Sequence, residues 1–457
     1  MIAELLCAAS LVLVFCCSRR SLRAGLLALL TVGYAYGILR ANFPANASHF
    51  IFDAAVLGLY AAIFTIPAQR QQRYRSLSLQ PWVAVLMAWP LLMFFVPTQD
   101  WLIQFVGLRG AVFFVPFLLI GARMEEEDFN TLAAGLAVLN IIELAFALGQ
   151  FFFGLQFFFP QNSVTDLIYR SNDVAGGSYR IPATFVVSAA YGGVMAFTMP
   201  FLVAVWAKSS TGSLRKRLLE AGFVAAGLGV FLSASRTAAV LLALSLVGIF
   251  TSLRLKASLR MGILTLLLLV GWLVSTDERL QRFMTLSDTS FIAERIGGSV
   301  NSTFIDVLMN YPMGNGLGGG GTSIPYFLQE RLQNPVLIEN EYGRILLEQG
   351  VMGLIVWVAF IVWLLVTAWP GRARQQYFGR LLLWCALAFS FIGAPLGTGL
   401  LTAIPLTAIL MLAGGWLVAR RREDALASPP RGLAKPIPLP GVEGWTRQQE
   451  NAAEGHV

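Results

Sequence analysis

Long apolar runs separated by short polar connections make up most of this chain, and they limit what it can fold into. A helix needs about 20 residues to cross the hydrocarbon core of a membrane, and most of the runs have roughly that length. The runs lie at about 2–17, 24–39, 50–67, 81–97, 101–121, 131–154, 182–206, 218–234, 237–253, 261–275, 350–369, 381–396 and 400–419. The sequence therefore predicts an all-α, polytopic membrane protein of about 12–13 transmembrane helices, the lower number applying if the short first run does not cross.

The composition agrees with this fold class. Hydrophobic residues make up 56% of the chain and charged residues 13%, with a mean hydropathy of +0.68, whereas about a quarter of a soluble domain is charged. The net charge of +8 is explained by basic residues beside membrane helices, so it does not indicate a nucleic-acid partner. The four cysteines lack the spacing of a metal site, and we expect no disulfide framework.

The basic residues between the runs give the chain an orientation. When the runs are threaded alternately, the most basic connections fall on one side, which the positive-inside rule makes cytoplasmic. They contain Arg19, Arg20, Arg23, Arg70, Arg73, Arg75, Lys208, Arg215, Lys216, Arg217, Arg254, Lys256, Arg260, Arg372, Arg374, Arg380, Arg420, Arg421 and Arg422. Residues 276–349 then form one large outward loop after the helices within 1–275. Residues 350–419 carry the last helices, and the proline-rich segment 420–457 is a cytoplasmic tail, expected to be disordered.

Charges inside the runs need another explanation, because burying them in a membrane is costly. Arg109 lies near the middle of the run at 101–121, and Glu143 lies in the next run. The two side chains could neutralise each other as a structural pair. Alternatively, Arg109 faces an outward cavity and an anionic ligand. The sequence leaves both interpretations open.

Two further arginines lie at the outward ends of runs. Arg180 precedes the run at 182–206, and Arg236 lies in the Leu-Ser-Ala-Ser-Arg-Thr-Ala segment at 232–238, a tight turn between two runs. The small residues around Arg236 allow a ligand or a neighbouring backbone to approach closely. Arginine binds phosphate through two parallel hydrogen bonds and stays charged, although an arginine at a membrane interface commonly extends into water without any ligand. Several arginines on one side favour an anionic ligand there.

Two segments stand out near the end of the predicted outward loop. Residues 314–321 read Gly-Asn-Gly-Leu-Gly-Gly-Gly-Gly, which we expect to be flexible. After them, Glu341, Arg344 and Glu348 fall on one helix face and aliphatic residues on another. We therefore expect an amphipathic helix that continues into the span at 350–369. Its charges mark either a solvated face or functional side chains.

Three segments, in this order, resemble the O-antigen ligase and polymerase superfamily of bacterial envelope glycosyltransferases. They are the Arg180 segment leading to Pro200, the segment around Arg236, and the segment that runs from Pro312-Met313-Gly314-Asn315-Gly316 through Asn340-Glu341-Tyr342 to Glu348-Gln349-Gly350-Val351-Met352-Gly353. The likeness covers about residues 180–354, and the amino-terminal helices resemble the family only in hydropathy. It implies a membrane protein of a dozen or more helices that uses polyprenyl-diphosphate-linked glycans, without a nucleotide sugar or a required metal.

The resemblance also implies roles for the outward arginines. Arg180 and Arg236 would hold the diphosphate of the lipid-linked donor. Arg109 or Arg344 would assist them. Together these side chains would neutralise the charge that develops on the leaving group.

In ligases of this family a histidine commonly precedes the asparagine of the third segment and is proposed to activate the acceptor hydroxyl. Here Glu339 occupies that position, and a carboxylate can serve as the general base. Asn340 and Glu341 would orient the acceptor. We do not expect either histidine to replace the missing imidazole, because His456 is in the predicted cytoplasmic tail and His49 lies far away in sequence.

The resemblance and the charge pattern together imply an inverting glycosyltransferase, without a metal ion or another cofactor, that polymerises or transfers polyprenyl-diphosphate-linked oligosaccharides at the periplasmic face of the bacterial inner membrane. Gly316 and Gly318 would let the outward loop fold over the substrates. The expected partners are the lipid-linked glycan, a glycan or lipid A-core acceptor, the lipid bilayer and envelope polysaccharide assembly proteins. The absent histidine favours an exopolysaccharide or O-antigen polymerase over a ligase. The alternatives are a transporter or flippase of lipid-linked glycans, and a non-catalytic partner in an envelope complex.

Overall fold

A computed structural model describes most parts of the chain. These parts are residues 1–65, 74–162, 165–175, 178–210, 212–252, 303–321, 324–336, 340–370, 378–397 and 399–427, with residues 290, 293, 297 and 338. Glu339, the predicted span at 261–275 and the tail beyond residue 427 lie outside them. Within the described residues the fold is helical, with one short β hairpin.

The first half of the chain begins with a series of helices. They are α1 (Ile2–Arg20), α2 (Leu22–Asn42), the 3-10 helix η1 (Asn46–Phe50), α3 (Ile51–Thr65), α5 (Gln80–Phe94), α6 (Trp101–Val112), α7 (Phe117–Arg123) and α8 (Glu126–Phe153). A connection follows that contains η2 (Leu155–Phe157), α9 (Asp166–Asn172) and the antiparallel strands β1 (Asp173–Ala175) and β2 (Ser178–Tyr179).

The second half completes the bundle. Its elements are α10 (Ser188–Trp206), α11 (Leu214–Leu232), α12 (Arg236–Ser252), α15 (Thr303–Asn310), η5 (Tyr326–Arg331), α16 (Glu341–Ala368), α17 (Phe378–Ile392), η7 (Ala394–Leu396) and α18 (Leu406–Ala427). Each predicted span that falls on described residues overlaps a helix or two consecutive helices. Among the described residues, seven helices are long and apolar enough to cross a membrane by length and composition, and α1 is one of them.

Three helices begin elsewhere than their apolar runs suggest, and one of them is α18, which begins at Leu406 in the run at 400–419. The run at 182–206 becomes helical only at Ser188, because the residues before it are held in a non-helical form. Ala183 has a φ of 51°, and the Thr184 carbonyl accepts a hydrogen bond of 2.8 Å from the backbone N–H of Ile38. Conversely, α16 begins at Glu341, so the end of the predicted outward loop is helical.

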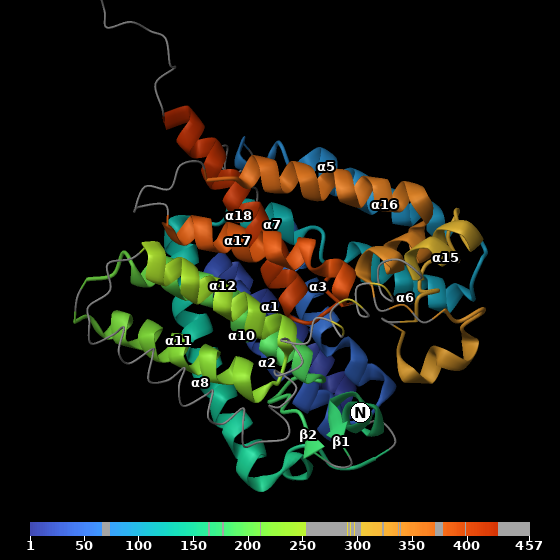
Figure 1. Ribbon diagram of the computed structural model, residues 1–457, viewed down its shortest axis with the longest axis horizontal. Coiled ribbons are helices and arrows are strands. Elements are labelled where there is room, and N and C mark those ends of the chain that lie inside the picture. The colour runs from blue at the N-terminus through green and yellow to red at the C-terminus, as the bar shows by residue number, and fades with distance from the viewer. Residues whose placement is uncertain are drawn as a thin grey trace, which may run out of the picture.

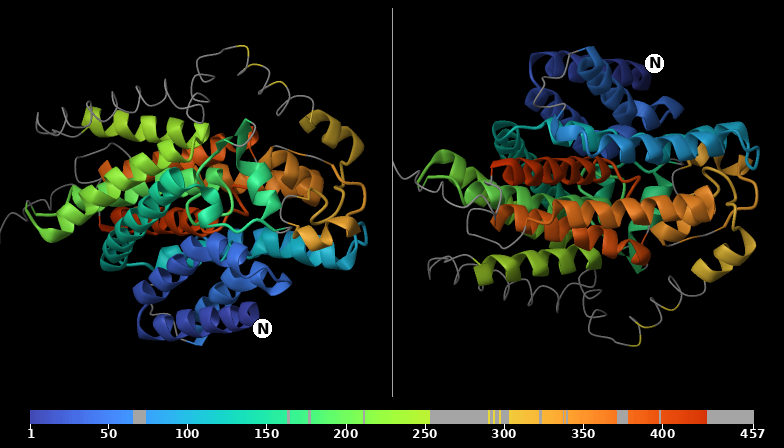
Figure 2. Two further views of the ribbon diagram at one scale, coloured as in Figure 1. Left: turned by 90° about the horizontal axis from the view of Figure 1, so that it is seen from below. Right: turned by 90° about the horizontal axis from the view of Figure 1, so that it is seen from above.

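Helix α10 forms the centre of the bundle, because it is buried along most of its length and contacts α8, α11, α12, α17 and α18. Helices α1, α2 and α3 pack together on one side of the molecule and α12 lies on the opposite side (Figure 2). Helices α5 and α16 run side by side along one edge, with α15 beside the beginning of α16 (Figure 1). The bundle is therefore built around one buried helix with the amino-terminal helices outside it.

Buried polar side chains connect the amino-terminal helices to this centre. The Tyr34 hydroxyl donates to Asn140 Oδ1 (3.1 Å), and Asn140 Nδ2 donates to Thr198 Oγ1 (2.9 Å). The three residues belong to α2, α8 and α10. Polar pairs of this kind connect helices in apolar surroundings, where an unsatisfied polar group is costly.

Candidate functional site

A cavity of about 540 Å³ lies within the bundle, inside the range of roughly 300–1,000 Å³ that is typical of ligand sites. Its wall combines aromatic, hydroxyl and basic side chains. These are Tyr36, Phe50, Phe114, Phe185, Phe197 and Phe389, then Ser235, Thr237, Ser390 and Thr402, and finally Arg40, His49 and Arg109. Among the described residues no aspartate or glutamate lines the cavity. The wall therefore suits a ligand that is largely apolar and carries an anionic group.

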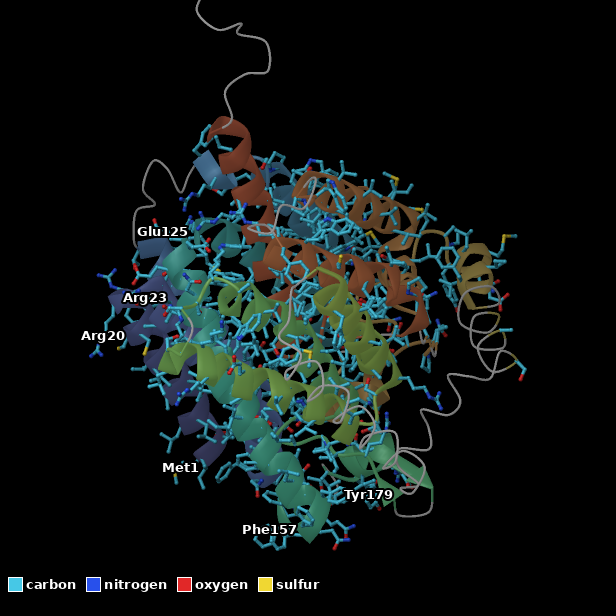
Figure 3. The ribbon with its side chains drawn as sticks, turned by 60° about the vertical axis from the view of Figure 1, so that its left-hand side comes forward. Met1, Arg20, Arg23, Glu125, Phe157 and Tyr179 are labelled. Carbon is cyan, nitrogen blue, oxygen red and sulfur yellow. The ribbon has the colours of Figure 1, made fainter. Side chains whose placement is uncertain are left out.

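The cavity forms where several connections between helices meet. They supply His49 and Phe50, residues 185–187, Ser235 and Thr237, Ile324 and Pro325, and several residues between 393 and 404. The charge pattern of the sequence assigns each of these connections to the outward side. Two ends of the bundle are visible in Figure 3, which shows Arg20, Arg23 and Glu125 at one end and Phe157 and Tyr179 towards the other.

Arg109 lines the cavity from α6 and pairs with an aspartate that the sequence analysis did not consider. Its Nη2 lies 2.6 Å from Asp53 Oδ1, on α3. The structural pair between Arg109 and Glu143 does not form, since Glu143 instead accepts hydrogen bonds from the backbone N–H (3.1 Å) and the hydroxyl (2.6 Å) of Thr184. Glu143 thus fixes the non-helical segment before α10, and Arg109 is left to face the cavity.

Two more basic residues of the cavity wall were missed. Arg40, in the last turn of α2, has its Nε buried without a hydrogen-bond acceptor. His49 lines the cavity as well, so its distance in sequence from the third segment was a poor guide to its place. The His49 carbonyl accepts from the Tyr36 hydroxyl (3.1 Å), and its ring packs edge-on against Phe327. A basic residue at an outward helix end was the available signal for Arg40.

The two arginines expected to hold the diphosphate are not among the residues that line the cavity. Arg236 begins α12, directly between Ser235 and Thr237, which do line it. Arg180 lies in the connection that leads to the lining residues 185–187. Its backbone N–H donates to the Asn172 carbonyl (2.7 Å) and its Nη2 to the Ser171 carbonyl.

The first two residues of the Asn-Glu-Tyr segment organise the end of α16. Asn340 is its N-cap, and the Asn340 Oδ1 accepts hydrogen bonds from the N–H groups of Tyr342 (2.9 Å) and Gly343 (3.1 Å). The fully buried Glu341 accepts from the N–H of Gly399 (2.6 Å) and of Leu401 (3.3 Å). Glu341 therefore holds the connection between α17 and α18, which forms one wall of the cavity.

The charged face of α16 is buried rather than solvated. Arg344 lies between two carboxylates, 2.7 Å from Glu341 Oε1 and 2.7 Å from Glu348 Oε2, and all three side chains are about 1% exposed or less. The Glu348 carboxylate in turn lies against Gly320. In this structure Arg344 does not line the cavity. Its pairing with two carboxylates suits a structural role, in which it holds the surrounding segments together.

The Gly-rich run is packed between α6 and α16. Gly316 and Gly318 have φ values of 85° and 78°, in the left-handed region that glycine adopts readily. The backbone of Gly318 comes so close to Gly107 of α6 that a Cβ on Gly107 would lie 2.2 Å from the Gly318 nitrogen. Residues 315–320 are buried, so close packing explains their composition better than flexibility does.

The two ends of the third segment bind to each other at a break in α16. Gly350 has a φ of 69° and interrupts the helix. There the Asn315 N–H donates to the Leu347 carbonyl (2.5 Å), and the Val351 N–H donates to the Pro312 carbonyl (3.0 Å). The Pro-Met-Gly-Asn-Gly and Gln-Gly-Val stretches are therefore two halves of one contact.

A comparison of the chain with protein-family models finds no match, and a comparison with curated proteins finds none either. Within the described part of the chain, no three His, Cys, Asp or Glu residues come together in a way that suits a metal ion. A functional assignment therefore starts from the cavity, its basic residues and the three resembling segments.

Proposed function

We propose that this protein is a membrane glycosyltransferase that transfers or polymerises polyprenyl-diphosphate-linked oligosaccharides at the periplasmic face of the bacterial inner membrane. One observation carries the proposal: a cavity with an apolar wall, basic side chains and no carboxylate among its described lining residues opens among connections that the sequence assigns to the outward side. A lipid-linked diphosphate has the matching chemistry, since it joins a long apolar chain to an anionic group. The proposal includes about 12–13 membrane spans and a cytoplasmic C-terminus.

In the proposed reaction the acceptor hydroxyl oxygen attacks the anomeric carbon of the donor glycan. The bond between that carbon and the diphosphate oxygen breaks, and the polyprenyl diphosphate leaves with the bonding electrons. Arg109, Arg180 and Arg236 stabilise the negative charge that develops on it. The proton of the hydroxyl passes to a general base, and the configuration at the anomeric carbon is inverted.

Two residues are candidates for the base. Glu339 occupies the position of the family histidine in the third segment. His49 is the second candidate, because it lines the cavity and carries an imidazole. Glu339→Gln and His49→Gln variants, compared at equal protein levels, distinguish them: the true base is the residue whose loss lowers transfer by about 100-fold or more.

Asn340, Glu341 and Arg344 take a supporting part in this proposal. Their hydrogen bonds end on the backbone of α16, on the connection between α17 and α18, and on one another. We therefore propose that they hold the cavity wall in place for the acceptor, with Gly316 and Gly318 packed behind α6.

The proposal is tested by the size distribution of lipid-linked and surface glycans in a deletion strain that carries the wild-type gene, Arg109→Ala or Arg170→Ala. Arg170 is a matched control, because its pair with Asp166 is exposed on α9. We expect Arg109→Ala to reproduce the deletion and Arg170→Ala to restore glycan. Single lipid-linked repeats accumulate if the enzyme is a polymerase, and complete polymer stays on its carrier if it is a ligase.

The same experiment tests the transporter alternative, which the position of the cavity within the bundle also fits. Glycan trapped on the cytoplasmic face of the membrane in the deletion strain would favour a flippase over a transferase. An unchanged glycan profile in the deletion strain would overturn both functions. Co-purification with envelope polysaccharide assembly proteins tests whether the chain works in a complex. It is carried out under conditions in which the Arg109→Ala variant is normally folded.

A further inference from the structure

The basic residues of the cavity wall differ in how their charge is balanced. Arg109 is paired with Asp53 at 2.6 Å, so the two together add no net charge. Asp53 itself is not a lining residue. Arg40 has no carboxylate partner among the described residues, whereas the Nε atoms of both arginines are buried without an acceptor. The formal positive charge of the wall is therefore concentrated at Arg40.

Arg40 interacts with the Tyr36 hydroxyl, which leaves the other N–H groups of its guanidinium available to a ligand. It lies in the last turn of α2, one turn after Tyr36, and both residues line the cavity. A helix C-terminus favours a cation, which alone could account for an arginine in this turn. That effect does not require the side chain to reach a cavity or its Nε to be buried without an acceptor, and both are observed here.

We infer that Arg40 binds a diphosphate-type oxyanion in the cavity, with Arg109, oriented by Asp53, as the second donor. The planar guanidinium offers two parallel hydrogen bonds to neighbouring phosphate oxygens, which an ammonium group cannot reproduce in the same geometry. The identity of the ligand as the carrier lipid rests on the proposed function. The anion site itself does not, because it follows from the charges and burial of the wall.

Binding by the purified full-length protein in nanodiscs of zwitterionic lipid tests the inference. The probes are a polyprenyl diphosphate and inorganic diphosphate, and the variants are Arg40→Ala, Arg40→Lys and the control Arg170→Ala. We expect Arg40→Ala to weaken binding by about tenfold or more, as the loss of a charged hydrogen bond implies. Arg40→Lys should fall between Arg40→Ala and the wild type, and Arg170→Ala should match the wild type. Thermal unfolding of each variant shows whether it is folded.

The two probes separate the sources of the anion. Loss of affinity for both supports a site for the diphosphate group alone, whereas loss confined to the lipid supports a site that also needs the chain. Loss confined to inorganic diphosphate supports a site for a free anion. The inference is overturned if folded Arg40→Ala keeps wild-type affinity for every probe that the wild type binds, or if the wild type binds neither.

This outcome is separate from that of the glycan experiment. If the deletion strain has altered glycans and Arg40→Ala binds normally, the proposed function stands and the Arg40 inference fails. If Arg40→Ala loses diphosphate binding while the deletion leaves glycans unchanged, the anion site stands and the proposed function fails.

Discussion

Asp53 on α3 neutralises Arg109 on α6, with 2.6 Å between Oδ1 and Nη2. The Arg109 side chain is 22% exposed and that of Asp53 9%, so the pair lies at the edge of the cavity rather than in open solvent. Arg109 is thereby held at the wall of the cavity by a residue that does not itself line it. The net charge of the cavity wall therefore depends on which of its arginines are paired with an acidic residue.

Replacing one partner of the pair between Asp53 and Arg109 should destabilise the protein more than replacing both partners. Asp53→Asn leaves the Arg109 charge without its partner, which we expect to cost about 2 kcal/mol of unfolding free energy. The double variant with Arg109→Met should be at least about 1 kcal/mol more stable than the sum of the single effects predicts. Chemical or thermal unfolding in detergent measures both. Additive effects would show that the pair contributes no coupling.

Replacing Gly107 by alanine should force α6 away from the Gly-rich run. The added Cβ would lie 2.2 Å from the backbone nitrogen of Gly318, and overpacking of this kind costs about 1–3 kcal/mol. Gly227→Ala in α11 is the control, because its Cβ would come no closer than 3.7 Å to another side chain. Equal thermal midpoints for the two variants would contradict the described packing.

Loss of the Asn340 side chain should loosen the first turn of α16. Asn340→Ala removes the acceptor for two backbone N–H groups, and loss of an N-cap costs about 1 kcal/mol. Asn340→Ser keeps a capping oxygen and should retain most of the stability. Hydrogen exchange of the peptide that contains Tyr342 and Gly343 reports the change directly. Exchange that is equally slow in both variants would argue against this cap.

Glu341→Ala should release the connection between α17 and α18, because the N–H groups of Gly399 and Leu401 lose their acceptor. In a cysteine-free background that carries Thr402→Cys, we expect a membrane-impermeant maleimide to react about fivefold faster after this change. Glu330→Ala, at an exposed position in η5, is the control. No change in the rate for Glu341→Ala would show that this carboxylate does not hold the connection.

The positions of the helices were predictable because hydropathy is a local property of the sequence. The run at 131–154 corresponds to α8 and the run at 24–39 to α2, within a few residues at each end. The non-helical stretch before α10 was not predictable in this way. It depends on contacts of Thr184 with Ile38 and Glu143, which are far from it in the chain.

The cavity was only partly predictable for the same reason. The cost of burying a charge singled out Arg109 correctly as a residue of interest. Its partner could not be identified, because Asp53 and Glu143 are both acidic residues within apolar runs and only the packing of α3 against its neighbours distinguishes them. Arg40 was overlooked because it directly follows an apolar run, where a basic residue is usually explained by the membrane interface.

The helical face of α16 was predicted correctly, but its burial was not. Glu341, Arg344 and Glu348 have the spacing that a solvated face would also have. Their side chains are buried because Arg344 donates hydrogen bonds to both carboxylates and Glu341 also accepts one from the N–H of Gly399. One-dimensional spacing cannot distinguish these two cases.

The break in α16 at Gly350 makes two distant stretches of the chain interdependent. A helix interrupted in apolar surroundings must find partners for its released backbone groups, and the stretch from Pro312 to Asn315 provides them. Neither stretch can therefore be transferred alone into another protein and keep its structure. A chimaera with a related protein should fold only if residues 312–315 and 347–351 come from the same parent. Selection for folded proteins from a library of recombined genes should therefore recover these two stretches together from one parent.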